Sequence, residues 1–183
     1  MKKNLVCFFT FLFFLSACFS KNINFQVVQN VPGYKDDIQG QDQEQEQEEV
    51  FAVSSLFEQA LSDFFYESGH IVSNSPVSIK KDSQSDAAEL KRALADTVLG
   101  SMDVLVRLEI EYDENRGKTP GAMVLSAIRG VKWNNYSPKT GLVISSGSAV
   151  PEKNGQKENG ETEVYKFASS VAAKISSTLN GLK

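Results

Sequence analysis

The stretch DVLVRLEIEYD, residues 103–113, decides the class of fold that this sequence predicts. Its apolar side chains occupy alternate positions, which are Val104, Val106, Leu108, Ile110 and Tyr112. Arginine and acidic residues fill the positions between them. Strict alternation over this length is typical of a β-strand that buries one face and exposes the other to water. We therefore expect an antiparallel or mixed sheet rather than a wholly parallel one.

Four more strands are predicted around this one. Downstream, strands are expected over residues 122–133 and 142–149, separated by a turn that contains Pro138 and Gly141. Together with residues 103–113 they form a three-stranded meander. Upstream, residues 22–31 alternate and predict a short, half-buried strand, and residues 70–72 predict another.

Three segments place apolar residues at three- and four-residue intervals, which indicates amphipathic helices: residues 50–68, a segment from Ser85 or Asp86 to about Gly100, and residues 164–179. The sequence thus predicts a single α+β domain with a mixed or antiparallel sheet packed on amphipathic helices, in the order β-α-β-α-β-β-β-α. The stripes of the first and last helices are expected to meet in one buried cluster that contains Leu61, Phe64, Phe167 and Val171.

The amino-terminal residues predict export from the cytoplasm. Two lysines precede an almost continuous apolar run over residues 5–15, and this run is too short for a comfortable membrane span. The tetrapeptide Leu15-Ser16-Ala17-Cys18 that follows resembles the lipobox of bacterial lipoproteins. This resemblance implies that Cys18 is acylated and becomes the first residue of the mature chain. The open alternative is a plain signal peptide with a chance cysteine.

The predicted organisation has three parts: a lipoprotein signal peptide over 1–17, a lipid anchor with a short strand and polar linker over 18–49, and a globular α+β domain over 50–183. Within the linker, residues 39–49 are rich in glutamine and acidic side chains. We expect a flexible excursion or a frayed helical lead-in there, with an acidic tether or cation-binding patch as the functional alternative. The expected location is the cell envelope, at the periplasmic face of the outer membrane.

Charge and residue types exclude several classes of function. The net charge is −4, and it becomes more negative when residues 1–17 are removed, so a nucleic-acid partner is not expected. A single histidine cannot build a zinc site of two or three imidazoles, and Gly117-Lys118-Thr119 lacks the context of a phosphate loop. A Ser-His-Asp triad through His70 stays formally open, although His70 is more simply a strand-edge residue. We predict no enzyme activity, no metal and no cofactor.

The acidic side chains Glu109, Glu111 and Asp113 share one face of the predicted strand. Alternate strand residues lie about 6.6 Å apart, a spacing that would also suit a glycosidase pair. Cation binding is the second alternative. We favour a solvated sheet face, because any acidic strand gives this pattern.

Three short segments carry a resemblance to a known superfamily. Residues 64–72, FFYESGHIV, resemble the helix-to-strand corner of the amino-terminal domain of the Tol-system propeller protein and of the curli-secretion lipoprotein family. Residues 101–106 are similar to the beginning of a hydrophobic strand in that superfamily, and residues 140–143 to the hairpin of the curli group. The resemblance implies an envelope lipoprotein that works through protein contacts. Membrane-inserting hairpins are not expected, because the loop at 113–122 and the strands are too short.

The turn between the last two predicted strands offers candidate partner-binding residues. Trp133, Tyr136 and Lys139 lie at or beside a hairpin tip that would expose them, and exposed aromatic residues are enriched at contact hot spots. The alternative is that Trp133 caps the core and Tyr136 is a structural plug. We predict a non-catalytic envelope assembly or interaction module, held on the membrane through acylated Cys18, with an unidentified envelope protein as partner. The alternative function is a carrier or sensor that binds a small amphiphile between sheet and helices.

Overall fold

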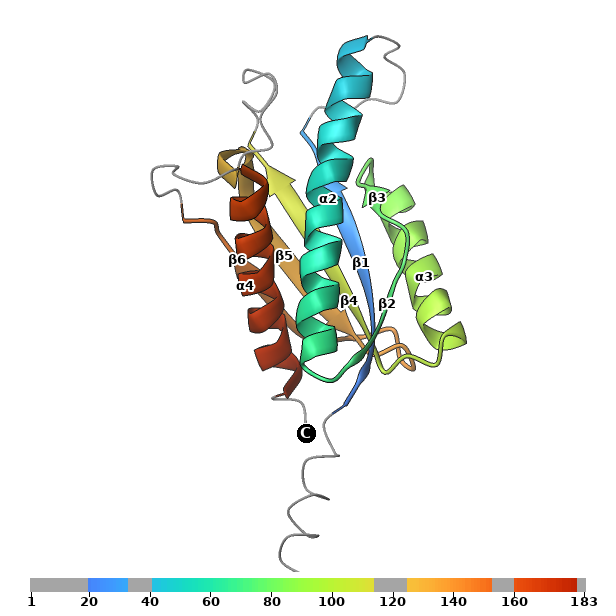
Figure 1. Ribbon diagram of the computed structural model, residues 1–183. Helices are drawn as coiled ribbons and strands as arrows, with labels where there is room; N and C mark the ends of the chain where they lie inside the picture. Colours follow the sequence, from blue (N-terminus) through green and yellow to red (C-terminus); the bar gives the residue numbers. More distant parts are fainter. Residues whose placement is uncertain (1–19, 33–40, 114–124, 153–159, 181–183) are drawn as a thin grey trace, which may run out of the picture.

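Strand β1 (Asn22–Asn30) is an interior strand of a mixed sheet of six strands in the computed structural model (Figure 1). The structure describes residues 20–32, 41–113, 125–152 and 160–180. Along the chain β1 is followed by α2 (Gln41–Glu67), β2 (Ile71–Asn74), β3 (Ser78–Ile79), α3 (Ser83–Leu99), β4 (Val104–Tyr112), the short 3-10 helix η3 (Leu125–Ala127), β5 (Ile128–Tyr136), β6 (Val143–Ala149) and α4 (Gly160–Asn180).

The order of the strands across the sheet is β2-β1-β4-β5-β6, and β3 also pairs with β1 beside β2. β1 is parallel to β2, β3 and β4, whereas β4, β5 and β6 form an antiparallel meander. The predicted α+β class, the mixed sheet and the order of elements are confirmed. The two-residue strand β3 is the one addition.

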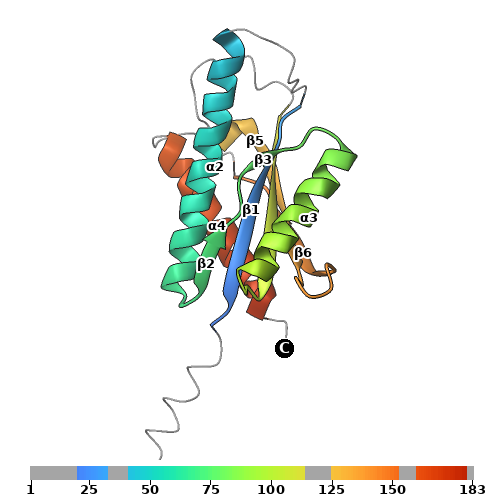
Figure 2. The same ribbon diagram turned by 90° about the vertical axis from the view of Figure 1, so that its right-hand side faces the viewer.

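Helices cover the sheet on both faces. α2 and α4 lie side by side over one face, and α3 lies over part of the opposite face, so that the sheet is seen between them in Figure 2. The main core fills the space between α2, α4 and the sheet, with Phe25, Phe57, Phe65 and Ile175 among its largest fully buried side chains. Leu61, Phe167 and Val171 belong to this cluster as predicted, while Phe64 is partly buried and packs against it.

The expectation that β1 is half-buried is wrong, because every residue from Ile23 to Gln29 is buried. One face of β1, which includes Ile23, Phe25 and Val27, contributes to the main core. The other face carries Asn24 and Gln26 and lies beneath α3. A central strand between two helical layers has no face left for water.

Hydrogen bonds engage the polar face of β1, although Asn24 Oδ1 has no partner among the described residues. The Asn24 amide donates to Ser75 Oγ at 2.9 Å and to Thr97 Oγ1 at 2.8 Å. Gln26 Oε1 accepts from Arg107 Nε at 3.1 Å, and Arg107 also binds Asp86 of α3 at 2.5 Å. α3 is therefore attached to the sheet by a polar network as well as by apolar packing.

The second face of β4 also differs from the expectation of a solvated surface. Leu105 is fully buried, and Arg107 is only 9% exposed. Leu105 joins Ala93 and Tyr136 in a small second apolar cluster between α3 and the sheet. Only the far half of this face, around Glu109 and Glu111, is half-buried.

Several element boundaries shift from those predicted. α2 begins at Gln41, so most of the polar tract belongs to the helix, as the lead-in alternative expected. α3 begins at Ser83 because Asp82 caps it: the Asp82 carboxylate accepts hydrogen bonds from the backbone N–H groups of Gln84 and Ser85. β5 runs from Ile128 to Tyr136 rather than over 122–133, and residues 122–124 lie outside the described residues. None of the described helices is long and apolar enough to cross a membrane.

Phe167 provides a test of the core. Its ring contacts that of Phe57 edge-on at 6.1 Å between centroids, and only 8% of Phe167 is exposed. We expect Phe167→Ala to lower the free energy of unfolding by about 3–5 kcal/mol, since the cavity lies between two helices and the sheet. Phe64→Ala should cost clearly less because Phe64 is only partly buried. Urea denaturation of both variants measures the two costs, and equal costs would contradict the difference in burial between Phe64 and Phe167.

Candidate functional site

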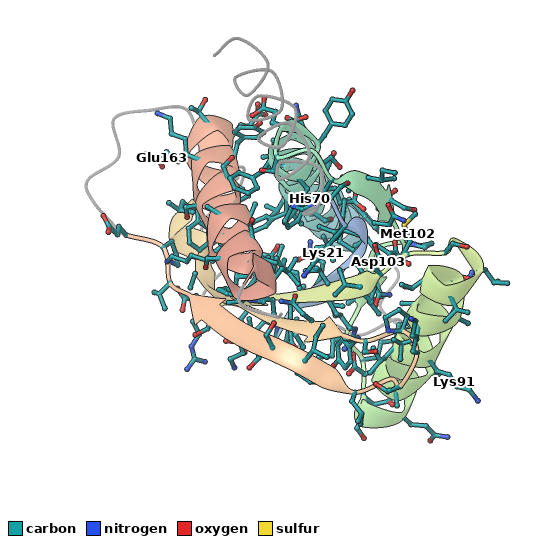
Figure 3. All side chains as sticks on the ribbon, turned by 90° about the horizontal axis from the view of Figure 1, so that it is seen from below. Lys21, His70, Lys91, Met102, Asp103 and Glu163 are labelled. Atoms are coloured by element: carbon teal, nitrogen blue, oxygen red, sulfur yellow. The ribbon has the colours of Figure 1, made fainter. Side chains whose placement is uncertain are left out.

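One end of the molecule gathers the start of the described chain and several turns. Asn22 pairs with Ile71, Ile23 with Val104, and Leu105 with Tyr136. We call this end of the molecule the amino-terminal pole. It contains the starts of β1, β2, β4 and β6, the end of β5 and the ends of α2 and α3. Figure 3 looks onto the pole: Lys21, His70, Met102 and Asp103 lie near its middle, and Glu163 lies well away.

Hydrogen bonds fix residues 20–22 at the centre of the pole. We call this set of contacts the amino-terminal clamp. It consists of Ser20 Oγ to the Gly69 carbonyl (2.8 Å), Lys21 N–H to His70 Nδ1 (3.0 Å), Lys21 Nζ to the Leu179 carbonyl (2.7 Å) and Asn22 N–H to Asp103 Oδ2 (2.8 Å). Backbone bonds from Ile71 N–H to the Lys21 carbonyl and from Asp103 N–H to the Asn22 carbonyl complete it. The clamp joins the first strand to β2, β4 and α4.

The turn after α2 brings His70 into the clamp. Gly69 has φ of +82°, a left-handed conformation that glycine adopts without steric cost directly after a helix end. The Gly69 and His70 N–H groups donate to the carbonyls of Tyr66 and Phe65, which closes the last turn of α2. α2 therefore ends at Glu67, and only residues 68–70 separate it from the start of β2 at Ile71.

His70 is buried and acts as a hydrogen-bond acceptor. Its ring contacts Phe65 edge-on, and Nδ1 accepts the Lys21 N–H, so the ring is neutral at that nitrogen. Burial lowers the pKa of His70 below its ordinary value, and the positive charge of Lys21 lowers it further. Within the described residues, no serine hydroxyl or carboxylate hydrogen-bonds to the ring. The geometry gives no support to a triad through His70 and agrees with the favoured interpretation of a strand-edge residue, because His70 directly precedes β2 and accepts a backbone N–H.

Two of the three predicted partner-binding residues are buried. Tyr136 is 8% exposed and packs with Ala93 and Leu105 beneath α3, and Trp133 is 3% exposed in the main core. Exposure at a hairpin tip is therefore wrong for both, and the core alternative holds: Trp133 faces the main core, and α3 covers Tyr136 at the end of β5. Lys139 is exposed in the turn as expected. The structure does not bring Lys139 and the two aromatic rings together into one surface.

The aromatic ring of Trp133 lies over Gly147 of β6. A Cβ atom at position 147 would lie 2.2 Å from the Trp133 ring, so only glycine leaves room there. This close approach explains a glycine inside a strand that no turn requires. Trp133 Nε1 is buried and has no hydrogen-bond partner among the described residues.

The acidic face of β4 is engaged in ion pairs. Glu109 accepts hydrogen bonds from Lys80 and Asn30, each at 2.7 Å, and Glu111 pairs with Lys132 of β5. In the part of the chain that the structure describes, no group of three or more His, Cys, Asp or Glu side chains could hold a metal ion. Glu109 and Glu111 thus link neighbouring segments of the fold, a role that differs from the solvated sheet face we predicted.

Comparisons with known proteins place this mixed-sheet α+β domain in a family. A family model with the description "Uncharacterised protein" matches residues 38–180, and the chain belongs to that family. No curated protein sequence matches it. The resemblance to the curli-secretion and Tol-propeller superfamily stays a prediction.

Solved structures with a similar arrangement are distant in sequence. A PelC dodecamer from Paraburkholderia phytofirmans is 14% identical, with 87% of this chain and 89% of that chain covered and a TM-score of 0.42. Lipoprotein GNA1162 from Neisseria meningitidis is 12% identical, with 87% and 99% covered and a TM-score of 0.34.

The burial of Tyr136 predicts a loss of stability on its truncation. We expect Tyr136→Ala to lower the free energy of unfolding by about 3 kcal/mol, because it empties the centre of the cluster beneath α3. Lys139→Ala, in the same turn but exposed, should change it by less than about 0.5 kcal/mol. Urea denaturation of both variants measures the difference. An unchanged midpoint for Tyr136→Ala would restore Tyr136 as a surface residue.

His70 predicts a pH-dependent stability. Because its pKa is lowered by folding, the unfolded chain binds a proton more readily, and stability rises with pH. The contribution of His70 to the free energy of unfolding is complete above the ordinary histidine pKa of about 6.5, and it declines as the pH falls below that value. His70 is the one histidine of the chain, so His70→Asn should flatten the curve between about pH 7.5 and about pH 5.5. Unfolding curves at several pH values measure the slope, and identical slopes for both proteins would contradict this assignment.

Proposed function

We propose that this protein is a membrane-anchored bacterial lipoprotein that acts as a non-catalytic assembly or interaction module of the cell envelope. The observation that carries the proposal is Leu15-Ser16-Ala17-Cys18, placed directly after a short apolar run and two lysines. Small residues before a cysteine at this position are what acylation and cleavage on the amino side of Cys18 require. The proposed location is the periplasmic face of the outer membrane.

The position of the clamp supports a short connection between lipid and domain. Only Phe19 lies between Cys18 and Ser20, and Ser20 is already bonded to Gly69. Acyl chains on Cys18 would therefore hold the folded domain directly at the bilayer, without a long tether. Each buried methylene contributes about 0.8 kcal/mol, so a multiply acylated cysteine anchors a protein stably.

A role in protein contacts is favoured over a carrier role by the filling of the core. Aromatic and aliphatic side chains from α2, α4 and the sheet occupy the space in which an amphiphile would have to bind. The polar side chains that could perform chemistry, including His70 and Glu109, are engaged in hydrogen bonds that hold the fold together.

The edge at β6 supports an interaction role. Within the described residues β6 pairs only with β5, and the strand Val143–Ala149 contains neither a charged residue nor a proline. Natural edge strands usually carry such residues because they prevent pairing with other chains. An unprotected edge of seven residues suits the addition of a strand from a partner protein.

Substitution of Cys18 tests the anchor. We expect Cys18→Ser to abolish incorporation of labelled palmitate and cleavage before residue 18, because the thiol is the acceptor of the lipid. Cys7→Ser is the matched control, since Cys7 lies within the predicted signal and should leave both unchanged. Mass spectrometry of the mature amino terminus and fractionation of cell membranes measure the outcome.

A second variant separates lipid anchoring from other membrane contacts. When residues 1–18 are replaced by the signal peptide of a soluble secreted protein, the domain should appear in the soluble periplasmic fraction. A Cys18→Ser protein that still incorporates labelled palmitate would refute the proposed lipidation.

A further inference from the structure

Exposed apolar side chains gather at the amino-terminal pole. Among the described residues, the large hydrophobic side chains that remain exposed at or near this end are Tyr66, Ile71, Val98, Leu99, Leu142, Val143 and Ile144. Leu99 and Leu142 are the most open of the aliphatic ones near the pole, with 83% and 67% of their surface exposed. The two other exposed large hydrophobic residues, Phe51 and Val150, lie toward the opposite end. We call the seven residues the apolar rim.

The register of the strands places the rim residues at the amino-terminal pole. Ile71 pairs with Asn22, the first residue of β1, and Val143 pairs with Tyr136, which in turn lies opposite Leu105 near the start of β4. Val98 and Leu99 end α3, only a few residues before β4 begins. A Cβ atom at Gly141 would lie 3.8 Å from Leu94, which places the β5–β6 turn against α3. The rim therefore lies at the same end of the sheet as the clamp.

The proposed acylation site lies close to the amino-terminal pole along the chain, so the rim must also lie close to the lipid. Cys18 precedes Ser20 by two residues, and two residues span at most about 7 Å. Ser20, Lys21 and Asn22 are fixed by the clamp and cannot lengthen the connection without breaking its hydrogen bonds. An anchor at Cys18 thus brings the whole pole to the level of the lipid headgroups.

We propose that the apolar rim lies against the bilayer surface and fixes the orientation of the domain on the membrane, an inference that rests on the proposed lipid anchor. Aliphatic side chains such as Leu99 and Leu142 enter the boundary between headgroups and acyl chains, and Tyr66 has the amphipathic ring typical of that boundary. Exposed Glu67 and Asp103 lie at the same end as exposed Lys139, so the pole is not a basic patch for anionic lipid. A surface rich in zwitterionic phosphatidylethanolamine suits it.

Single-cysteine labelling tests this contact in the acylated protein. Cys7 leaves with the predicted signal and the Cys18 thiol is consumed by the lipid, so one engineered cysteine is the one free thiol of the mature chain. A fluorophore is attached at Leu99→Cys or Leu142→Cys, with Phe51→Cys and Val150→Cys as exposed apolar controls from the other end. The proteins are reconstituted in vesicles of phosphatidylethanolamine and phosphatidylglycerol that contain a lipid with a nitroxide quencher near its headgroup.

We expect the lipid quencher to lower fluorescence at the two rim positions by about twofold or more, because interfacial side chains enter about 5–10 Å into the headgroup region. Fluorescence at the two control positions should be unchanged. Iodide in the aqueous phase should give the reverse order. Circular dichroism of each variant verifies that the fold is retained.

The other outcomes overturn the inference in distinguishable ways. If the acyl mass is present but the rim labels are as open to iodide as the controls, the rim does not touch lipid and the anchor stands. Rim labels that resist both quenchers would mean that a second copy or another protein covers the pole. If no acyl group is found, the anchor proposal fails, and the same labelled proteins are then mixed with vesicles. Quenching of the rim labels by the lipid quencher would show that the rim contacts lipid without an anchor. Its absence would overturn both proposals.

Discussion

The hydrogen bonds on the polar face of β1 are the constraint on which the rest of the structure depends. A central strand between two helical layers must bury both faces, and here one face carries Asn24 and Gln26. A buried amide without partners costs about as much as a lost hydrogen bond to water. Thr97 and Ser75 bind Asn24, and Arg107 binds Gln26 and reaches Asp86, so the positions of α3 and of the segment after β2 follow from these two side chains.

The two faces of the sheet are therefore held by different physical means. On the α2 and α4 side, stabilisation comes from apolar burial in one continuous cluster. On the α3 side, a cluster of few apolar residues is combined with directional bonds, including the ion pair of Arg107 with Asp86. Directional bonds fix the rotation of α3 more strictly than apolar contact alone would, and this rotation determines which part of β5 is covered.

Local sequence patterns predicted most of the fold. The alternation over residues 103–113 and the helical stripes around Leu61 and Val171 depend only on neighbouring residues, and they gave the correct elements and order. The burial of β1 could not be predicted, because the alternation of Phe25 and Gln26 is also that of a half-exposed strand. For Tyr136 the missing information was the position of α3, and for His70 it was a backbone partner 49 residues away. In each case the missing contact is distant along the chain.

The place of β1 in the sheet has a consequence for the order of folding. The first strand that the structure describes lies inside the sheet, and its partners β2 and β4 end at Asn74 and Tyr112. The sheet cannot close around β1 until the chain is complete as far as Tyr112, because these pairings are non-local. Terminal residues usually tolerate proteolytic trimming, yet trimming past Lys21 would here split the sheet between β2 and β4. A protease that acts at this terminus would thus remove the protein rather than shorten it.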